Sequence, residues 1–170
     1  MDPKLLPIVR DLEANFSGRL EEYRDEAHVF MQADQIIRAL TLLRDKHQFG
    51  LLSTLSAVDY WPQRSPRFHI IYQLSSLAQN ITLQLRVPLD GDTPELPSAT
   101  KVYANANWRE RELFDMFGIY IRDHPDLRRI LLPPDMEGHP LRKDYPLGYE
   151  EPQFTFNYEE IDLRKPYAKE

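Results

Sequence analysis

Hydrophobic positions near the N-terminus recur at helical spacing. Asp2-Pro3 is typical of a helix start and Ser17-Gly18 of a helix end. Between them the apolar residues fall three or four positions apart: Leu5, Ile8, Val9, Leu12 and Phe16. Two short strands are predicted next, over 20–24 and 27–31, with a turn at Asp25-Glu26. A second amphipathic helix is predicted from a cap at Asp34 to about Phe49-Gly50.

The middle of the chain is typical of β-structure. Apolar and polar residues alternate over 68–74 and 80–88, and 51–61 also favours a strand. The short links at 62–66 and 77–79 predict consecutive antiparallel pairing. Residues 90–97 are expected to form a loop, and helices are expected around 99–103 and from about Trp108 to Phe117. Asn107 and Glu110 suit a capping pair for the last helix, and Gly118 suits its end.

This order of elements predicts an α+β domain with one largely antiparallel sheet and helices packed on it. A ferredoxin-like arrangement is the more specific expectation. The domain is predicted to span residues 1–145, including a charged segment at 107–145. Residues 146–170 are predicted to form an extended C-terminal arm, in which Phe154, Phe156 and Tyr158 alternate in a strand-like way.

Composition narrows the classes of partner and chemistry. The 170 residues carry a net charge of −6, which argues against nucleic-acid binding because phosphates need a concentrated positive surface. The chain has no cysteine, which excludes thiol catalysis and thiolate metal sites. No apolar run approaches the roughly 20 residues of a membrane helix. We therefore expect a soluble chain that associates with a membrane only through a partner.

Residues 107–145 combine dense charge with large apolar side chains, which favours a paired, partly buried contact. On a helical wheel, Arg109 and Glu110 fall within the apolar arc of the predicted helix. Either these two side chains reach out from the edge of that arc, or the helix is contacted on several sides with its charges paired. The same segment could instead hold a catalytic or metal site.

Acid–base residue types in this segment raise the possibility of a stand-alone hydrolase: Glu110, Glu112, Asp115, His124 and His139. Every carboxylate has an arginine close in sequence, however, and such pairing lowers a carboxylate pKa and suits structure better than general acid catalysis. No nucleophile elbow, phosphate loop or dinucleotide fingerprint is present. Metal-ligand types also occur, without a recognised zinc spacing: Asp123, His124, Asp126, Asp135 and His139. We therefore predict no catalytic, cofactor-binding or metal-binding residue.

Three blocks of this segment resemble the signature of the C subunit of NADH:quinone oxidoreductase, respiratory complex I: ERELFDMFGI at 110–119, HPDLRRIL at 124–131 and GHPLRKDYP at 138–146. The resemblance implies a cofactor-free structural component of the peripheral arm that docks on the D subunit near the quinone site, with the B and I subunits nearby. The complex passes electrons from NADH to quinone and translocates protons, and its FMN and iron–sulfur clusters belong to other subunits.

The resemblance also implies a peripheral position on the cytoplasmic side of the cell membrane, or on the matrix or stromal side in an organelle. The equivalent subunit of a membrane-bound hydrogenase or of a ferredoxin- or F420-linked oxidoreductase remains the alternative.

The charged blocks then become candidate contact residues. One group is expected to organise the helix: Arg109, Glu110, Arg111, Glu112 and Asp115. A second group is expected to clasp neighbouring subunits: Arg128, Arg129, Arg142, Lys143 and Asp144. Planar arginine is well suited to bidentate pairing with partner carboxylates.

Overall fold

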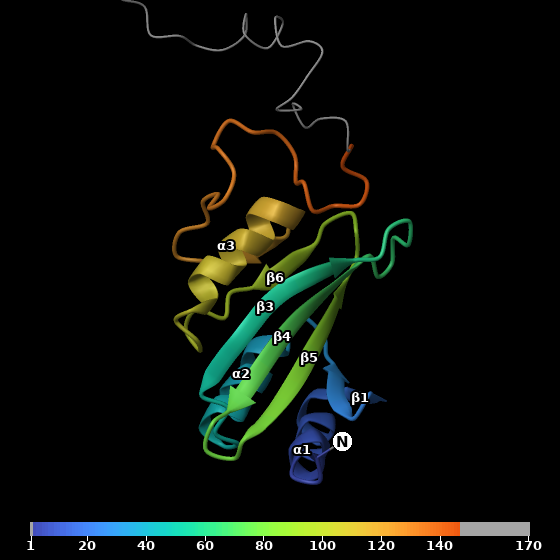
Figure 1. The fold of residues 1–170 in the computed structure, drawn as a ribbon, viewed down its shortest axis with the longest axis vertical. Helices are drawn as coiled ribbons and strands as arrows, with labels where there is room; N and C mark the ends of the chain where they lie inside the picture. Colours follow the sequence, from blue (N-terminus) through green and yellow to red (C-terminus); the bar gives the residue numbers. More distant parts are fainter. Residues whose placement is uncertain (1, 147–170) are drawn as a thin grey trace, which may run out of the picture.

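The computed structural model describes residues 2–146 of the chain. Figure 1 shows a sheet with helices near both of its ends. In chain order the elements are α1 (Leu5–Phe16), β1 (Arg19–Tyr23), β2 (Glu26–Phe30), α2 (Ile36–Asp45), β3 (Leu51–Asp59), β4 (Phe68–Ser76), β5 (Ile81–Leu89), β6 (Glu95–Pro97), α3 (Ala106–Phe117) and β7 (Tyr120–Arg122). The predicted arm, apart from Pro146, lies outside the described residues.

The main sheet has five strands in the order β1-β2-β5-β4-β3. All neighbours pair antiparallel except β2 and β5, which run parallel. The predicted α+β class and the consecutive antiparallel pairing of the middle strands are therefore confirmed. The ferredoxin-like arrangement is not found, because a tight turn rather than a helix joins β4 to β5. That turn ends at Asn80, which has a positive φ of 52°.

A second, two-stranded sheet pairs β6 with β7 in parallel. The prediction of a loop throughout 90–97 was wrong, because Glu95–Pro97 form β6. This strand is only three residues long, too short for its sequence to show an alternation of apolar and polar residues. The predicted helix around 99–103 is a single turn, in which the N–H groups of Val102 and Tyr103 both donate to the carbonyl of Ala99. These short elements lead the chain from β5 to α3.

Three predicted element boundaries differ from those of the structure. The β1–β2 turn lies at Arg24-Asp25, where both residues have a positive φ, rather than at Asp25-Glu26. Helix α2 stops at Asp45 instead of Phe49-Gly50, and Gln48 beyond it takes a left-handed conformation (φ 59°). Gln35 rather than Asp34 occupies the N-cap position, without a side-chain hydrogen bond.

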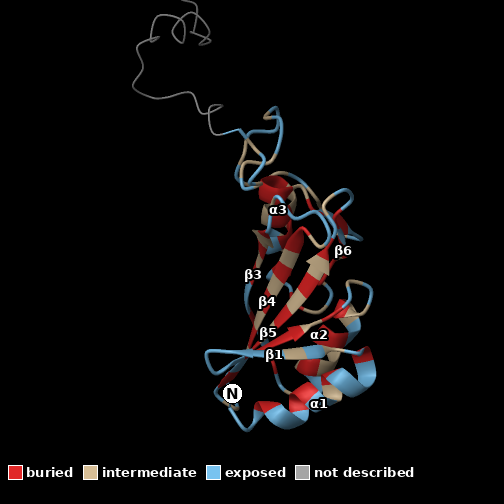
Figure 2. Ribbon diagram, turned by 90° about the vertical axis from the view of Figure 1, so that its right-hand side faces the viewer, coloured by how far each residue is buried: buried red, intermediate tan, exposed pale blue. Residues whose placement is uncertain are grey.

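The hydrophobic core lies against one face of the main sheet. Helices α1 and α2 cover this face, and buried positions alternate with less buried ones along the strands (Figure 2). The five helical positions read from the α1 sequence are all buried, as predicted. Helix α3 packs beside β3, and its Phe117 ring meets Phe68 of β4 edge-on at 6.5 Å.

Substitution of two leucines in α1 tests this description of the core. Leu12 is fully buried in α1, whereas Leu6 in the same helix is 44% exposed. Leu12→Ala should lower the free energy of unfolding by about 2–5 kcal/mol through lost burial and a cavity. Leu6→Ala is the matched control and should cost about 1 kcal/mol or less. Urea unfolding followed by circular dichroism measures both, and equal losses would contradict this account of the core.

Candidate docking face around helix α3

Helix α3 begins at Ala106 and ends where Gly118 adopts a left-handed conformation (φ 67°). The Gly118 N–H donates to the carbonyl of Phe114, which confirms the predicted C-terminal stop. The predicted capping pair of Asn107 and Glu110 was wrong. Asn105 stands at the N-cap without a side-chain hydrogen bond, and the Glu110 side chain turns away from the helix end.

Glu110 is a buried carboxylate that no arginine of residues 2–146 neutralises. One of its oxygens accepts the Ala99 N–H at 2.6 Å and the other accepts the Ser98 hydroxyl at 2.7 Å. The residue is 0% exposed, and this burial raises its pKa to about 7 against the lowering effect of the two hydrogen bonds. The expectation that arginine pairing keeps every carboxylate ionised was therefore wrong for Glu110.

His124 lies beside Glu110 with its Nε2 atom 3.8 Å from the carboxylate. Its Nδ1 accepts the Asp126 N–H at 3.0 Å, so Nε2 carries the proton and donates to the Asn107 carbonyl at 3.2 Å. These bonds describe a neutral imidazole that ties the start of the C-terminal segment to the first turn of α3.

Asp115 is the second fully buried acid of α3, and its environment is the opposite of that around Glu110. One oxygen accepts the N–H groups of Ile130, Leu131 and Leu132 at 2.8–3.0 Å. The other oxygen pairs with Arg129 at 2.9 Å. Burial alone would raise the pKa of Asp115, but these four donors outweigh it and lower that pKa.

The carbonyl groups at the C-terminus of α3 are covered by residues 139–142. His139 Nδ1 donates to the Asp115 carbonyl at 2.9 Å, and the Leu141 N–H donates to Met116 at 3.1 Å. Arg142 donates to the carbonyls of Phe117 and Gly118. A guanidinium at this position also complements the negative end of the helix dipole. We call residues 123–146 the capping segment.

Gly118 leaves the space for this cap. A Cβ atom added there would lie 2.4 Å from the His139 ring and 2.8 Å from an Arg142 nitrogen, in a backbone conformation that side chains rarely adopt.

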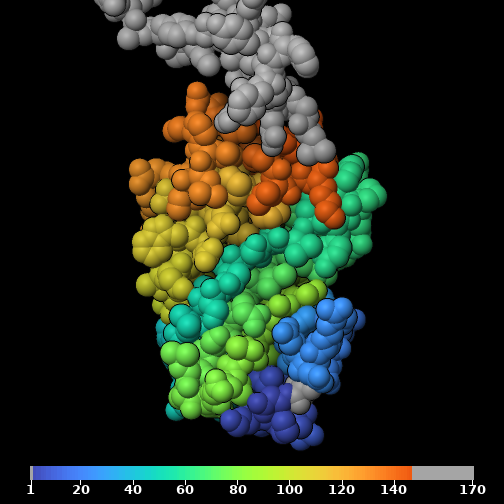
Figure 3. Space-filling view, viewed as in Figure 1, coloured from blue at the N-terminus to red at the C-terminus, as the bar shows by residue number. Residues whose placement is uncertain are grey.

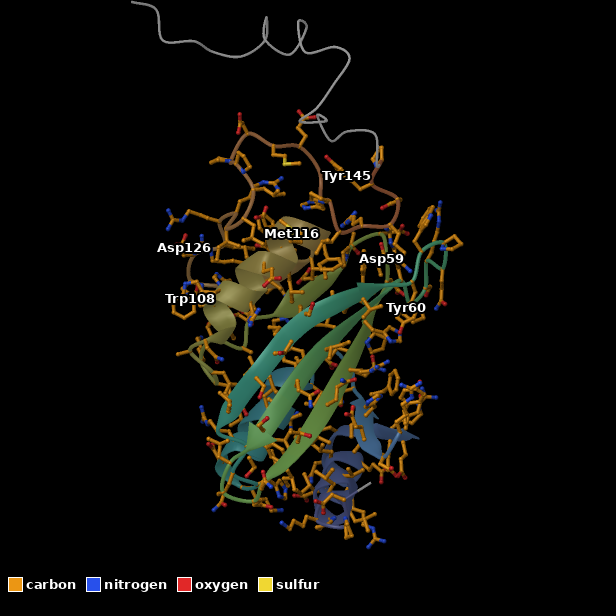
Figure 4. All side chains as sticks on the ribbon, in the orientation of Figure 1. Asp59, Tyr60, Trp108, Met116, Asp126 and Tyr145 are labelled. Atoms are coloured by element: carbon orange, nitrogen blue, oxygen red, sulfur yellow. The ribbon has the colours of Figure 1, made fainter. Side chains whose placement is uncertain are left out.

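A buried arginine fixes the end of the capping segment. Arg67 is 5% exposed and contacts both oxygens of Asp59 and both oxygens of Asp144, at 2.6–3.0 Å. The Lys143 N–H donates to Asp59 as well. Burial alone would raise the pKa of Asp59, but the bonds from Arg67, Lys143 and Trp61 lower it overall. Figure 4 shows Asp59 at the end of β3, near the part of the capping segment that carries Tyr145.

The structure divides the ten candidate contact residues by exposure. Glu110 and Asp115 lie inside the protein and can affect a partner only through the residues they position. Arg109 pairs with Glu112 at 3.5 Å, and Arg111 donates to the carbonyls of Arg128 and Arg129. Arg129, Arg142 and Asp144 make the internal contacts described above. Arg109, Arg128 and Lys143 are exposed on the outside of this cluster.

Sequence reasoning missed Asp59, Arg67 and Ser98. Asp59 and Arg67 leave a signal in the sequence, because Asp59 lies near the end of the strand predicted over 51–61 and Arg67 directly precedes the strand predicted over 68–74. Antiparallel pairing of consecutive strands places such neighbours opposite each other, as the register of Asp59 with Phe68 shows. Nothing local in the sequence signals that Ser98 holds Glu110.

Residues 2–146 bring together no group of three or more His, Cys, Asp or Glu side chains that could hold a metal ion. None of the helices within this range is long and apolar enough to cross a membrane.

Comparisons with known proteins agree on one family. The family model of the respiratory-chain NADH dehydrogenase 30 kDa subunit matches residues 29–151. The C subunit of NADH-quinone oxidoreductase from Roseiflexus sp. (strain RS-1) is 46% identical over 151 residues, covering 88% of this chain and 86% of that protein. The corresponding C subunit from Trichlorobacter lovleyi is 42% identical over 142 residues, covering 82% and 88%.

Solved structures show the same fold. A trypsin-resistant fragment (1–134) of Nqo5 has a TM-score of 0.65 at 26% identity, covering 73% of this chain and 99% of that one. A chain of the archaeal membrane-bound sulfane sulfur reductase, a respiratory membrane complex, has a TM-score of 0.72 at 20% identity, covering 98% and 96%. At that identity the second likeness concerns the fold alone.

Glu110 predicts a pH dependence with a definite sign. Its folded-state pKa of about 7 lies above its ordinary value of 4.5, so the folded protein holds the proton more tightly. Its contribution to stability is therefore full below pH 4.5 and is lost as the pH rises through 7. Relative to Glu110→Gln, the parent should lose about 3 kcal/mol between pH 4.5 and 8. Denaturant unfolding across this range measures the difference, and a constant difference would refute the assignment.

Asp115 should be the most sensitive carboxylate of α3 to deletion. Asp115→Ala removes the acceptor of three N–H groups and leaves Arg129 unpaired, which should cost about 3–5 kcal/mol. Glu112→Ala, which removes only the half-exposed partner of Arg109, should cost about 1 kcal/mol or less. Thermal unfolding of the two variants provides the comparison. Similar melting temperatures would show that Asp115 does not hold the capping segment.

Proposed function

Because the chain belongs to the family of the respiratory-chain NADH dehydrogenase 30 kDa subunit, we propose that it serves as the C subunit of a proton-translocating NADH:quinone oxidoreductase. The observation that carries this proposal is the extent of the family match, which runs from β2 through the capping segment. The chain would form part of the peripheral arm and support electron transfer from NADH to quinone without taking part in the chemistry.

The environment of the acid–base groups supports a non-catalytic role. Asp115 is held ionised by four donors, and Glu110 is sealed inside the protein. His124 and His139 both donate to backbone carbonyls of α3. Burial also lowers the pKa of His139. The contacts of these groups hold the capping segment against α3, which suits a structural role. The FMN and iron–sulfur clusters would belong to other subunits of the complex.

The outer surface of the capping segment and α3 is the proposed contact with the D subunit, near the quinone site and close to the B and I subunits. The exposed cations of this surface are Arg109, Arg128 and Lys143. Buried contacts hold in place the backbone that carries them. Arg128 is already bidentate to Asp126, at 2.6 and 2.7 Å, so its guanidinium is oriented before any partner arrives. A surface ordered in advance loses less entropy on docking.

The proposed location is the cytoplasmic side of the cell membrane, or the matrix or stromal side in an organelle. The chain would reach the membrane through the other subunits of the complex. Purification of the tagged chain from native membranes tests the whole assignment. Recovery of flavoprotein NADH-input subunits, with NADH-dependent quinone reduction, supports it. Nickel–iron hydrogenase subunits in their place would overturn it in favour of the related complex.

Lys143→Glu should weaken assembly by placing an acid at the docking face. We expect at least a fivefold lower yield of the complex, because a like charge facing partner carboxylates repels them. Arg10→Glu is the matched control: it makes the same charge change on the exposed side of α1, at the opposite end of the molecule (Figure 1). Native gel electrophoresis of solubilised membranes measures the yield. Equal yields for the two variants would exclude this surface as the contact.

A further inference from the structure

The main sheet has a second face that no helix of the described residues covers. Figure 3 looks onto this face, where β3, β4 and β5 lie open beside the β1–β2 hairpin. The register places one row of side chains across all five strands on this face: Ser56, Ile71, Arg86, Phe30 and Arg19. These alternate with buried residues that face α1 and α2, so their side chains point away from the core.

The open face of β3, β4 and β5 is nearly free of charge. Charged residues make up 28% of the chain, yet Arg86 is the single residue of permanent charge on this face of the three strands. The other positions are uncharged or weakly apolar, as in Val58, Ile71 and Gln73. A face selected only for contact with water needs no such depletion, whereas the centres of protein interfaces are depleted in charge and keep hydrogen-bonding groups.

Hydrogen bonds within β5 and between neighbouring strands order the polar side chains of this face. Gln84 donates to the Gln73 side chain at 3.2 Å, and Arg86 Nε donates to Gln84 at 2.7 Å. The hydroxyls of Ser53 and Ser75 join at 2.7 Å. Within the described residues, Nε makes the only hydrogen bond of the Arg86 guanidinium. Its two other nitrogens therefore remain as donors, in a planar pair suited to a carboxylate.

We propose that the open face of β3, β4 and β5 is a second docking surface, taken by a neighbouring protein of the complex that places a carboxylate opposite Arg86 within an uncharged patch. The inference rests on the proposed function, in that it places the chain inside a multisubunit complex. It adds a contact separate from the face around α3.

Charge argues for this occupant over three others. Nucleic acid or an anionic lipid surface needs several cations together, and these three strands offer one on this face. A second copy of the chain, related by a two-fold axis through this face, would bring its own Arg86 toward the first and repel it. A carboxylate on a different protein would accept hydrogen bonds from the Arg86 guanidinium, and the uncharged side chains of the face would pack around this ion pair.

The test replaces the chain in its native host with tagged full-length variants and measures the complex recovered from membranes. Arg86→Glu reverses the one charge of the face and should lower recovery at least tenfold. Leu77→Glu is the control, because Leu77 is 82% exposed in the turn between β4 and β5 and lies off the face. It should leave recovery unchanged. Equal recovery for the two variants would overturn the proposal.

A second measurement separates docking from folding. A photoreactive residue at position 73 should cross-link one other subunit in membranes, whereas the same residue at position 77 should not. This readout decides the matter if Arg86→Glu also lowers the melting temperature of the full-length chain. A cross-link between two copies of the chain, or none at all, would overturn the proposal. If the parent chain recovers no complex, the proposed function itself fails, which is a different result from loss of recovery in Arg86→Glu alone.

Discussion

The buried carboxylate of Asp115 holds the part of the molecule that has almost no secondary structure of its own. Residues 123–146 contain no helix or strand, so their backbone amides find few partners among themselves. Asp115 accepts three of these amides in succession and pairs with Arg129. One side chain in the last turn of α3 therefore determines the path of a segment fifteen residues further along the chain.

The two buried acids of α3 show how environment sets the role of a carboxylate. Asp115 meets four donors, one of them cationic, and stays charged. Glu110 meets two neutral donors and a neutral imidazole, and its pKa rises to about 7. Neither is available to a substrate, although both types belong to acid–base catalysis when they line a cleft. Both carboxylates are buried and hydrogen-bonded inside the protein, unlike carboxylates that line a cleft.

Local pattern predicted the elements that carry a clear period. The helical positions of α1 and the alternation of β4 and β5 are set by burial on one side, which the sequence records every two to four residues. Other features depend on partners far away in sequence. Arg67 contacts Asp144 across 77 positions, and Glu110 contacts Ser98 rather than any nearby arginine. Charge density indicated that residues 107–145 make paired contacts, but it could not identify the partners of each charge.

The Arg67 cluster joins residues that are made at different times during synthesis. A ribosome releases Asp59 and Arg67 long before Lys143 and Asp144 exist, and domains generally begin to fold from the N-terminal side. The sheet and its helices can close while α3 still lacks its cap. The Arg67 cluster therefore stays incomplete until residues 143 and 144 have been made.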